Sequence, residues 1–171
     1  GSTAELMRTL ASGCEAPLVL DADGLSIFGT DLGMLQRRRA PTVLTPHAGE
    51  AGRLLGRESG EVSAHRLDSA RELASRANAV VVLKGDDTIV TDGVRTAVNS
   101  LSSPALATAG TGDVLAGIVG AFLARGLDAF EGAAAAVFAH AAAGEVAAAR
   151  IGNQDGVIAG DVIGAIPRSM I

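Results

Sequence analysis

The sequence has almost no aromatic residues: Trp and Tyr are absent, and aromatic side chains make up 2% of its 171 residues. A core must therefore be built from Ala, Val, Leu and Ile. The hydrophobic fraction of 48% and the length suit one domain with a sizeable core. Cys14 is the single cysteine. It excludes a disulfide within the chain and fits a reducing compartment, so we expect a cytoplasmic protein.

Basic residues and long apolar runs are also scarce. Lys and Arg number 14 against 19 Asp and Glu, and the formal net charge of −5 argues against non-specific binding to nucleic acid. The one basic run, Arg37–Arg39, is expected to be a solvated surface patch. No uninterrupted apolar segment reaches membrane-spanning length and no signal peptide is visible. We therefore expect neither nucleic acid nor a membrane among the partners.

Short apolar runs alternate with helical patterns, which predicts an α/β domain with a mainly parallel sheet. Apolar runs followed by polar turns predict strands within 17–25, 41–50 and 79–85, and two short strands at 88–93 and 95–99. Apolar spacing predicts helices at 3–12, from about residue 49, at 61–79, after Gly112, at 131–150 and at 157–166, the last stopped by Pro167. The loops after residues 20, 45 and 83 should line one edge, because parallel sheets bind ligands at the carboxyl ends of their strands.

The stretch LATAGTGDVLAG (106–117) places Gly110, Thr111, Gly112 and Asp113 where a helix is expected to begin. Glycines let backbone N–H groups turn toward one point, and a helix N-terminus attracts anions, so the stretch is a candidate anion hole. Asp113 beside it could take a proton from an attacking hydroxyl. The alternative is an ordinary turn in which Asp113 only stabilises the helix start. The stretch lacks the lysine of a Walker loop and the third glycine of a dinucleotide fingerprint.

Two further loops are candidate sites. In LKGDDTIVTDG (83–93), Lys84 could reach a phosphate, Gly85 permits a sharp turn and Thr88 offers a hydroxyl. The alternative there is a hairpin turn with Lys84 in solvent. In TPHAGE (45–50), His47 and Glu50 follow a strand end. One His and one Glu do not make a metal site, and a histidine bonded to nearby backbone is the alternative.

Other polar residues carry weaker signals. The two acids of DADG (21–24) could bind a ribose or metal-bound water, or could simply end the strand. His65 and His140 fall within expected helices, and we expect both to be structural.

Five segments together resemble, in order, the C-terminal part of the ADP/ATP-dependent NAD(P)H-hydrate dehydratase family, the carbohydrate-kinase-like half of the nicotinamide nucleotide repair enzymes. They are LVLDADGL, VLTPHAGEAGRLLG, VVVLKGDDTIVTDG, LATAGTGDVLAGIVGAFLARG and AVFAHAAAGEVAA. The resemblance implies a ribokinase-like α/β/α sandwich, N-terminally truncated, in which residues 3–171 form a partial domain. It agrees with the fold class that the apolar pattern predicts independently.

The family removes a hydration adduct from NADH or NADPH, with ADP in most bacteria and ATP in eukaryotes. By resemblance, the ring hydroxyl is phosphorylated and the phosphate then leaves, which gives NAD(P)H, AMP and phosphate when ADP is the donor. Asp113 matches the catalytic acid, and His47 and Asp113 match contacts to the hydrate. Glu50 could order Mg²⁺ through water. The residues that match the nucleotide-binding run are Lys84, Gly85, Asp86, Asp87, Thr88 and Gly112.

Some features depart from the family pattern. Ala48 stands where the family has proline, and SLSSP follows Asn99 where the family has N-x-T-G. The family domain begins upstream of Thr3, so we expect an exposed apolar edge and face on the sheet. The family's habits suggest a homo-oligomer and a fused epimerase domain. A ribokinase-fold kinase of a small sugar or vitamin-precursor alcohol, and a nucleotide-binding module without turnover, remain alternatives.

Overall fold

The computed structural model describes residues 2–101 and 103–169. Five strands form one open sheet in the order β1-β2-β3-β4-β5. Their bounds are β1 (Leu18–Leu20), β2 (Thr42–Leu44), β3 (Val80–Leu83), β4 (Thr88–Thr91) and β5 (Thr96–Asn99). β1, β2 and β3 are parallel, whereas β4 and β5 extend the sheet as antiparallel strands. The predicted α/β class, the mostly parallel sheet and the meander of the last two strands are confirmed.

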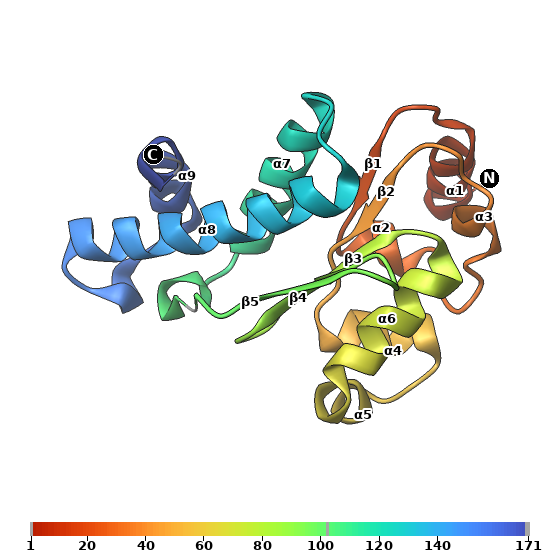
Figure 1. Cartoon of the computed structure of the whole chain (residues 1–171), viewed down its shortest axis with the longest axis horizontal. Coiled ribbons are helices and arrows are strands. Elements are labelled where there is room, and N and C mark those ends of the chain that lie inside the picture. Colours follow the sequence, from red (N-terminus) through yellow and green to blue (C-terminus); the bar gives the residue numbers. More distant parts are fainter. Residues whose placement is uncertain (1, 102, 170–171) are drawn as a thin grey trace.

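The helices cover both faces of the sheet (Figure 1). The first group is α1 (Thr3–Gly13), α2 (Asp23–Ser26), α3 (Gly33–Gln36), α4 (Ala48–Leu55), α5 (Ser59–Ala64) and α6 (Arg66–Ala77). The second group is α7 (Thr111–Ala124), α8 (Ala129–Ile151) and α9 (Ala159–Ser169), with the 3₁₀ turns η1 (Pro104–Leu106) and η2 (Gln154–Gly156). Each group forms its own hydrophobic core against one sheet face.

The central strand β3 shows why the sheet needs both layers. Val81 and Leu83 belong to the core beneath the first helix group, and Val80 and Val82 belong to the core beneath the second. Successive side chains of a strand point to opposite faces, so an unbroken apolar run requires cover on both sides. For this physical reason, the unbroken apolar run VVVL (80–83) predicts a strand that is buried on both faces.

Three local predictions need correction. The helix expected at 61–79 is two helices, because His65 leaves helical geometry at the junction (φ −130°, ψ 49°). Pro167 lies inside α9, which continues to Ser169, three residues past the end predicted at residue 166. Arg38 is buried rather than solvated: its guanidinium donates to the carbonyls of Ala11, Cys14 and Ala16, which satisfies its donors inside the domain.

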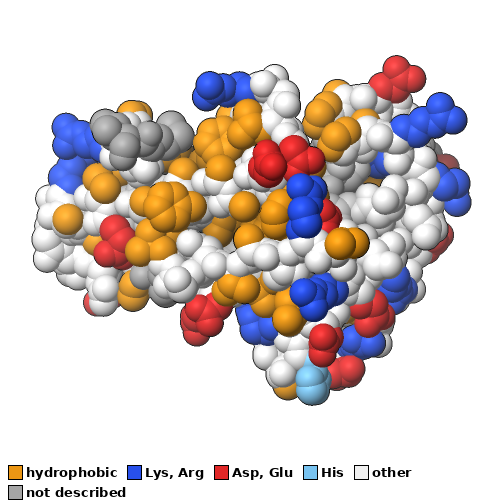
Figure 2. Space-filling model, viewed as in Figure 1, with side chains coloured by type: hydrophobic (Ala, Val, Ile, Leu, Met, Phe, Trp, Pro, Cys, Tyr) orange, Lys and Arg blue, Asp and Glu red, His pale blue; other side chains and the backbone are white. Residues whose placement is uncertain are grey.

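The surface carries exposed apolar groups. β1 is the outermost strand on its side of the described sheet, and Leu18 and Val19 are only half-buried. Hydrophobic side chains gather over the half of the molecule formed by α7, α8 and α9 (Figure 2), where Phe138 and Ile163 are more than half exposed. In the described part of the chain, α8 alone is long and apolar enough to cross a membrane, but 56% of its apolar window is buried, as in a core helix.

Candidate active site

Lys84 lies where the carboxyl ends of the parallel strands meet. Its Nζ is 2.8 Å from Asp21 Oδ1 and 3.9 Å from Glu50 Oε2. Its backbone N–H donates to the carbonyl of Pro46 over 2.8 Å. The loops after β1, β2 and β3 therefore converge as predicted. The Lys84 side chain is 23% exposed, so the alternative of a lysine extended into solvent is wrong.

The backbone beside Asp21 is strained. Ala22 has φ 48° and ψ −120°, a region that residues with a Cβ rarely adopt. Such outliers persist only where the surrounding structure enforces them, and they cluster at functional sites. The strain at Ala22 accompanies the placement of the Asp21 carboxylate against Lys84.

His47 and Glu50 form a reciprocal cap on α4. His47 Nδ1 accepts hydrogen bonds from the N–H groups of Gly49 (3.0 Å) and Glu50 (3.4 Å), and Glu50 Oε2 accepts from the His47 N–H (2.8 Å). The backbone-bonded histidine considered from sequence is therefore what the loop contains. His47 Nε2 lies 3.5 Å from Glu50 Oε1, on a side chain that is 54% exposed, so this nitrogen is accessible to a ligand.

Arg66 contacts the backbone of residues 84–88, here called the lysine turn, and holds it in place. No local sequence pattern indicates this role. The guanidinium Nη2 of Arg66 donates to the carbonyls of Leu83 (3.2 Å) and Asp87 (2.9 Å), and both terminal nitrogens lie 3.4 Å from the Lys84 carbonyl. A Cβ built on Gly85 would lie 2.5 Å from Arg66 Nη2. A side chain at residue 85 would therefore push the guanidinium away from these carbonyls.

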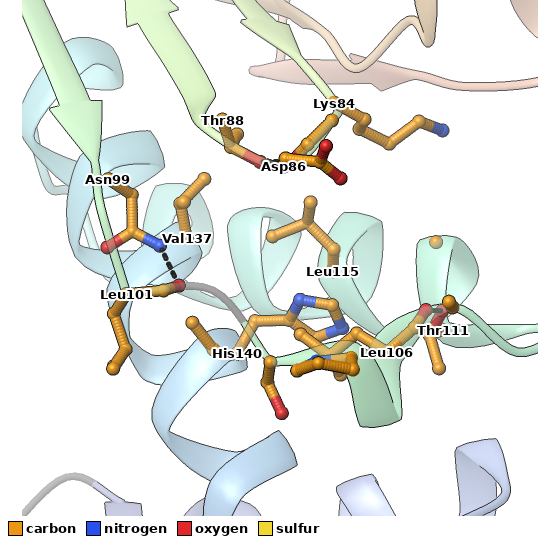
Figure 3. Close-up of a pocket in the computed structure, with 16 residues that line it drawn as sticks. Lys84, Asp86, Thr88, Asn99, Leu101, Leu106, Thr111, Leu115, Val137 and His140 are labelled. Carbon is orange, nitrogen blue, oxygen red and sulfur yellow. Dashed lines mark hydrogen bonds between the residues drawn. The ribbon is translucent and has the colours of Figure 1, made fainter. Parts of the chain in front are cut away.

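A cavity of about 430 Å³ opens beside this turn, between β4, β5, η1, α7 and α8. Figure 3 shows Lys84, Asp86 and Thr88 at one side of it and His140 with Leu106 at another. Lys84, Gly85, Asp86, Thr88 and Gly112, all predicted to bind nucleotide, line the cavity. Asp87, predicted with them, does not: its carbonyl is occupied by Arg66.

His140 lies in the same cavity, although the sequence predicts only a structural histidine on a helix. Burial lowers the pKa of His140 to about 4, and a hydrogen bond with the Thr111 backbone opposes this shift. The imidazole is therefore neutral at neutral pH. Among described residues, Nε2 of His140 and Oγ of Ser103, which also lines the cavity, are buried without a hydrogen-bond partner.

The start of α7 separates this cavity from a second hollow. Thr111 and Gly112 line the cavity, whereas Gly110 and Asp113 line an apolar groove of about 620 Å³ between α7 and α9. A Cβ built on Gly112 would lie 3.5 Å from Lys84 Nζ, so the N-terminus of α7 lies next to the Lys84 ammonium and its two carboxylate partners. Gly110 adopts φ 86°, which favours glycine there. Asp113 is exposed in the first turn of α7.

Metal binding by the protein alone has little support. Within 2–101 and 103–169, no three His, Cys, Asp or Glu side chains gather to hold an ion. Asp21 and Glu50 instead flank the Lys84 ammonium. This donor set fits Mg²⁺ that is carried by nucleotide phosphates and keeps its own water, since Mg²⁺ commonly binds through few carboxylates together with phosphates.

Comparison with known proteins identifies the same family that the sequence motifs resemble. A family model described as NAD(P)H-hydrate dehydratase matches residues 3–168. The chain is 43% identical, over 98% of its length, to the bifunctional NAD(P)H-hydrate repair enzyme Nnr of Thermofilum pendens, and covers 32% of that protein. It is 41% identical, over 92% of its length, to the ADP-dependent (S)-NAD(P)H-hydrate dehydratase of Neisseria meningitidis, and covers 54% of it.

Solved structures show the same fold. The ADP/ATP-dependent NAD(P)H-hydrate dehydratase of Bacillus subtilis, co-crystallised with ATP and Mg²⁺, superposes with a TM-score of 0.79 at 29% identity, over 92% of this chain and 55% of that one. A ribokinase-like superfamily protein of Enterococcus faecalis superposes with a TM-score of 0.78 at 23% identity, over 98% of this chain and 57% of that one. The expected ribokinase-like fold is confirmed. The chain spans about half of these proteins and a third of the Thermofilum relative, and it belongs to the NAD(P)H-hydrate dehydratase family.

Proposed function

We propose that this chain carries the reaction centre of an ADP-dependent (S)-NAD(P)H-hydrate dehydratase, a lyase that repairs hydrated NADH and NADPH. The observation that carries the proposal is the position of the α7 N-terminus, with Thr111 and Gly112 toward one hollow and Gly110 and Asp113 toward another. A phosphoryl group that crosses from a nucleotide on one side to a hydroxyl on the other passes the N–H groups of this helix start.

The nucleotide is proposed to occupy the cavity beside the lysine turn. The volume of this cavity, about 430 Å³, is in the range of small-ligand sites. Lys84 offers the positive charge for a phosphate, and Gly85, Asp86, Asp87 and Thr88 shape the turn on which it lies. Gly112 adjoins the Lys84 ammonium without a side chain in between, so phosphate can approach both the lysine and the helix N-terminus.

Asp113 is proposed to be the general base. Its carboxylate is exposed at the groove and is free to take the proton of the ring hydroxyl as that oxygen attacks the phosphorus. The amides of residues 110–113 form the anion hole for the charge on the transferred group. The ring nitrogen then donates electrons as the phosphate leaves, and loss of a proton from the neighbouring ring carbon to solvent forms the ring double bond. With ADP as donor, the products are NAD(P)H, AMP and phosphate.

His47 is proposed to contact the hydrate. Because Nδ1 accepts from backbone N–H groups, the neutral ring carries its proton on Nε2, which is a donor at the loop surface. We also propose that Glu50 orders Mg²⁺ through water. That ion, held mainly by the nucleotide phosphates, would neutralise negative charge on the transferred group.

A direct assay tests the proposal. The protein is given hydrated NADH with ADP or ATP, and NADH absorbance and released phosphate are followed together. We expect both products in equal amounts, with ADP the better donor. Phosphorylation of a sugar or vitamin-precursor alcohol, with the hydrate ignored, would favour the kinase alternative. Nucleotide binding in calorimetry without phosphate release would favour a module without turnover.

We further propose that residues 3–171 act as part of a cytoplasmic homo-oligomer, in a protein that also holds an epimerase activity. Phe138 and Ile163 are exposed apolar side chains, and their burial against a second subunit would remove them from water. The epimerase part of the proposal is supported by the bifunctional relative of which the chain covers about a third. Met170 and Ile171 lie outside the described residues. Sedimentation at several concentrations tests the oligomer: a monomer at micromolar concentration would contradict it.

A further inference from the structure

Lys84 is fixed both at its backbone and at its ammonium. Its backbone N–H donates to the Pro46 carbonyl over 2.8 Å, and Arg66 Nη1 lies 3.4 Å from its carbonyl oxygen. Its ammonium is 2.8 Å from Asp21 Oδ1, whereas Glu50 Oε2 is 3.9 Å away, beyond hydrogen-bond distance. The Asp21 side chain, which is 14% exposed, is therefore the group that fixes the ammonium. The proposed chemistry gives this carboxylate no role.

The fixed ammonium lies beside the start of α7. A Cβ built on Gly112 would be 3.5 Å from Lys84 Nζ and 3.7 Å from Asp21 Oδ2, so the ion pair lies against this helix N-terminus. Figure 3 shows the Lys84 side chain extending away from Asn99 and Val137, with its ammonium at the margin of the cavity. The positive charge is therefore next to the proposed anion hole rather than in the middle of the nucleotide cavity.

The ion pair leaves the lysine able to bind a ligand. An ammonium has three N–H donors, and the hydrogen bond to Asp21 uses one of them. A lysine side chain is long and flexible, and without a partner its ammonium would sample many positions. Asp21 removes that freedom before a ligand arrives, so the remaining donors are preorganised at the N-terminus of α7.

The backbone next to Asp21 is constrained as well. Ala22 has φ 48° and ψ −120°, a conformation that residues with a Cβ rarely adopt. Strained residues persist where the surrounding structure enforces them, and they cluster at functional sites. A relaxed loop could end β1 equally well, so the strain supports a role for the direction in which the Asp21 carboxylate points.

We infer that Asp21 is a positioning residue for the proposed phosphoryl transfer: it holds the Lys84 ammonium at the N-terminus of α7, where the transferred group passes. This inference rests on the proposed function. Binding of a nucleotide phosphate requires the positive charge of Lys84 near the cavity, whereas transfer requires that charge at one point. Loss of Asp21 should therefore lower kcat more than it weakens nucleotide binding.

Asp21→Asn, which has nearly the same shape, tests the inference in the full chain with hydrated NADH and ADP. We expect kcat to fall about 10- to 100-fold, with the Kd for ADP in calorimetry within about 3-fold of wild type. Lys84 should react about 10-fold faster with an amine-selective acylating reagent, because a charged hydrogen bond no longer holds its side chain. Asp23→Asn, at an exposed aspartate in the same segment, should behave as wild type in all three measurements.

Asp21→Glu separates position from charge. It keeps the carboxylate and lengthens the side chain by one methylene, so Lys84 should react as slowly as in wild type while kcat falls about 10-fold. ADP binding shows that each variant is folded.

Three results would overturn the inference. They are wild-type kcat in either Asp21 variant, unchanged acylation of Lys84 in Asp21→Asn, and equal losses of kcat and ADP affinity in Asp21→Asn, which would indicate a role in binding or folding. In each of these cases the proposed function stands, because wild type still turns over the hydrate. If wild type shows no turnover with hydrated NADH, the proposed function fails and the inference fails with it.

Discussion

The ammonium of Lys84 lies 2.8 Å from the carboxylate of Asp21, and this ion pair joins β3 to β1 across the intervening strand β2. Lys84 is also the only lysine in the sequence. A nucleotide phosphate in the cavity would share this ammonium with Asp21. The single lysine therefore gives a chemical probe for the proposed nucleotide site.

An amine-selective acylating reagent should modify two groups, Lys84 and the N-terminal amine. We expect ADP at ten times its Kd to slow modification of Lys84 about 10-fold, because bound phosphate occupies the ammonium in most molecules. Peptide mass spectrometry measures both rates, and the N-terminal amine is the internal control. Equal rates for Lys84 with and without saturating ADP would show that the phosphates lie elsewhere.

Arg66 should control the order of the lysine turn. Arg66→Lys removes the planar group that reaches the carbonyls of Leu83 and Asp87, and we expect a loss of about 1–2 kcal/mol in unfolding free energy. Hydrogen exchange should rise at residues 85–88 and ADP should bind more weakly. Arg71→Lys, an exposed position on the same helix, is the matched control. Unchanged exchange in the turn would contradict the role.

Two glycines in adjacent helices should respond oppositely to alanine. A Cβ on Gly144 would lie 2.9 Å from Leu106 Cγ, so Gly144→Ala should destabilise the fold by about 1–3 kcal/mol through overpacking. At Gly120, on α7, nothing lies within 4 Å of the added Cβ, and Gly120→Ala should stabilise by about 0.5–1 kcal/mol through helix propensity. Chemical denaturation measures both, and a stabilised Gly144→Ala chain would refute the close packing.

The buried His140 predicts a loss of stability in acid. Burial lowers its pKa from 6.5 to about 4, so between these values the unfolded chain binds a proton that the folded chain does not. Stability should fall as the pH drops from 6.5 toward 4, by about 3 kcal/mol in total. His140→Gln should remove this component of the pH dependence, whereas His65→Gln should keep it. Identical pH profiles for His140→Gln and wild type would mean that the histidine is not held neutral.

The parts of the fold set by continuous apolar runs could be predicted from the sequence. The run at 80–83 is a strand buried on both faces, and the polar residues after it, Lys84 above all, do converge with Asp21 at the sheet edge. The Gly110–Asp113 segment begins a helix as expected. In each case the signal is local, because it depends on the order of apolar, polar and glycine residues along a short stretch.

The residues that sequence reasoning missed act over long separations. Arg66 reaches a turn 18 to 21 residues away, and Arg38 caps carbonyls 22 to 27 residues away, so no neighbouring pattern reveals either. His140 lies on an Ala-rich helix and looks structural, because only tertiary packing opens a cavity in front of it. Tertiary packing also decides which helical glycines are tightly packed: Gly117 and Gly120 on α7 meet nothing within 4 Å, whereas Gly144 on α8 lies against Leu106 and Ser103.

The central claim is that Asp113 takes the proton of the ring hydroxyl, and turnover by Asp113→Asn with hydrated NADH and ADP tests it most directly. We expect kcat to fall by about 10²- to 10⁴-fold, with ADP affinity unchanged because Asp113 lines the groove and not the cavity. Asp68→Asn, an exposed aspartate in the first turn of α6, should retain wild-type turnover. Turnover by Asp113→Asn equal to that of wild type would contradict the account.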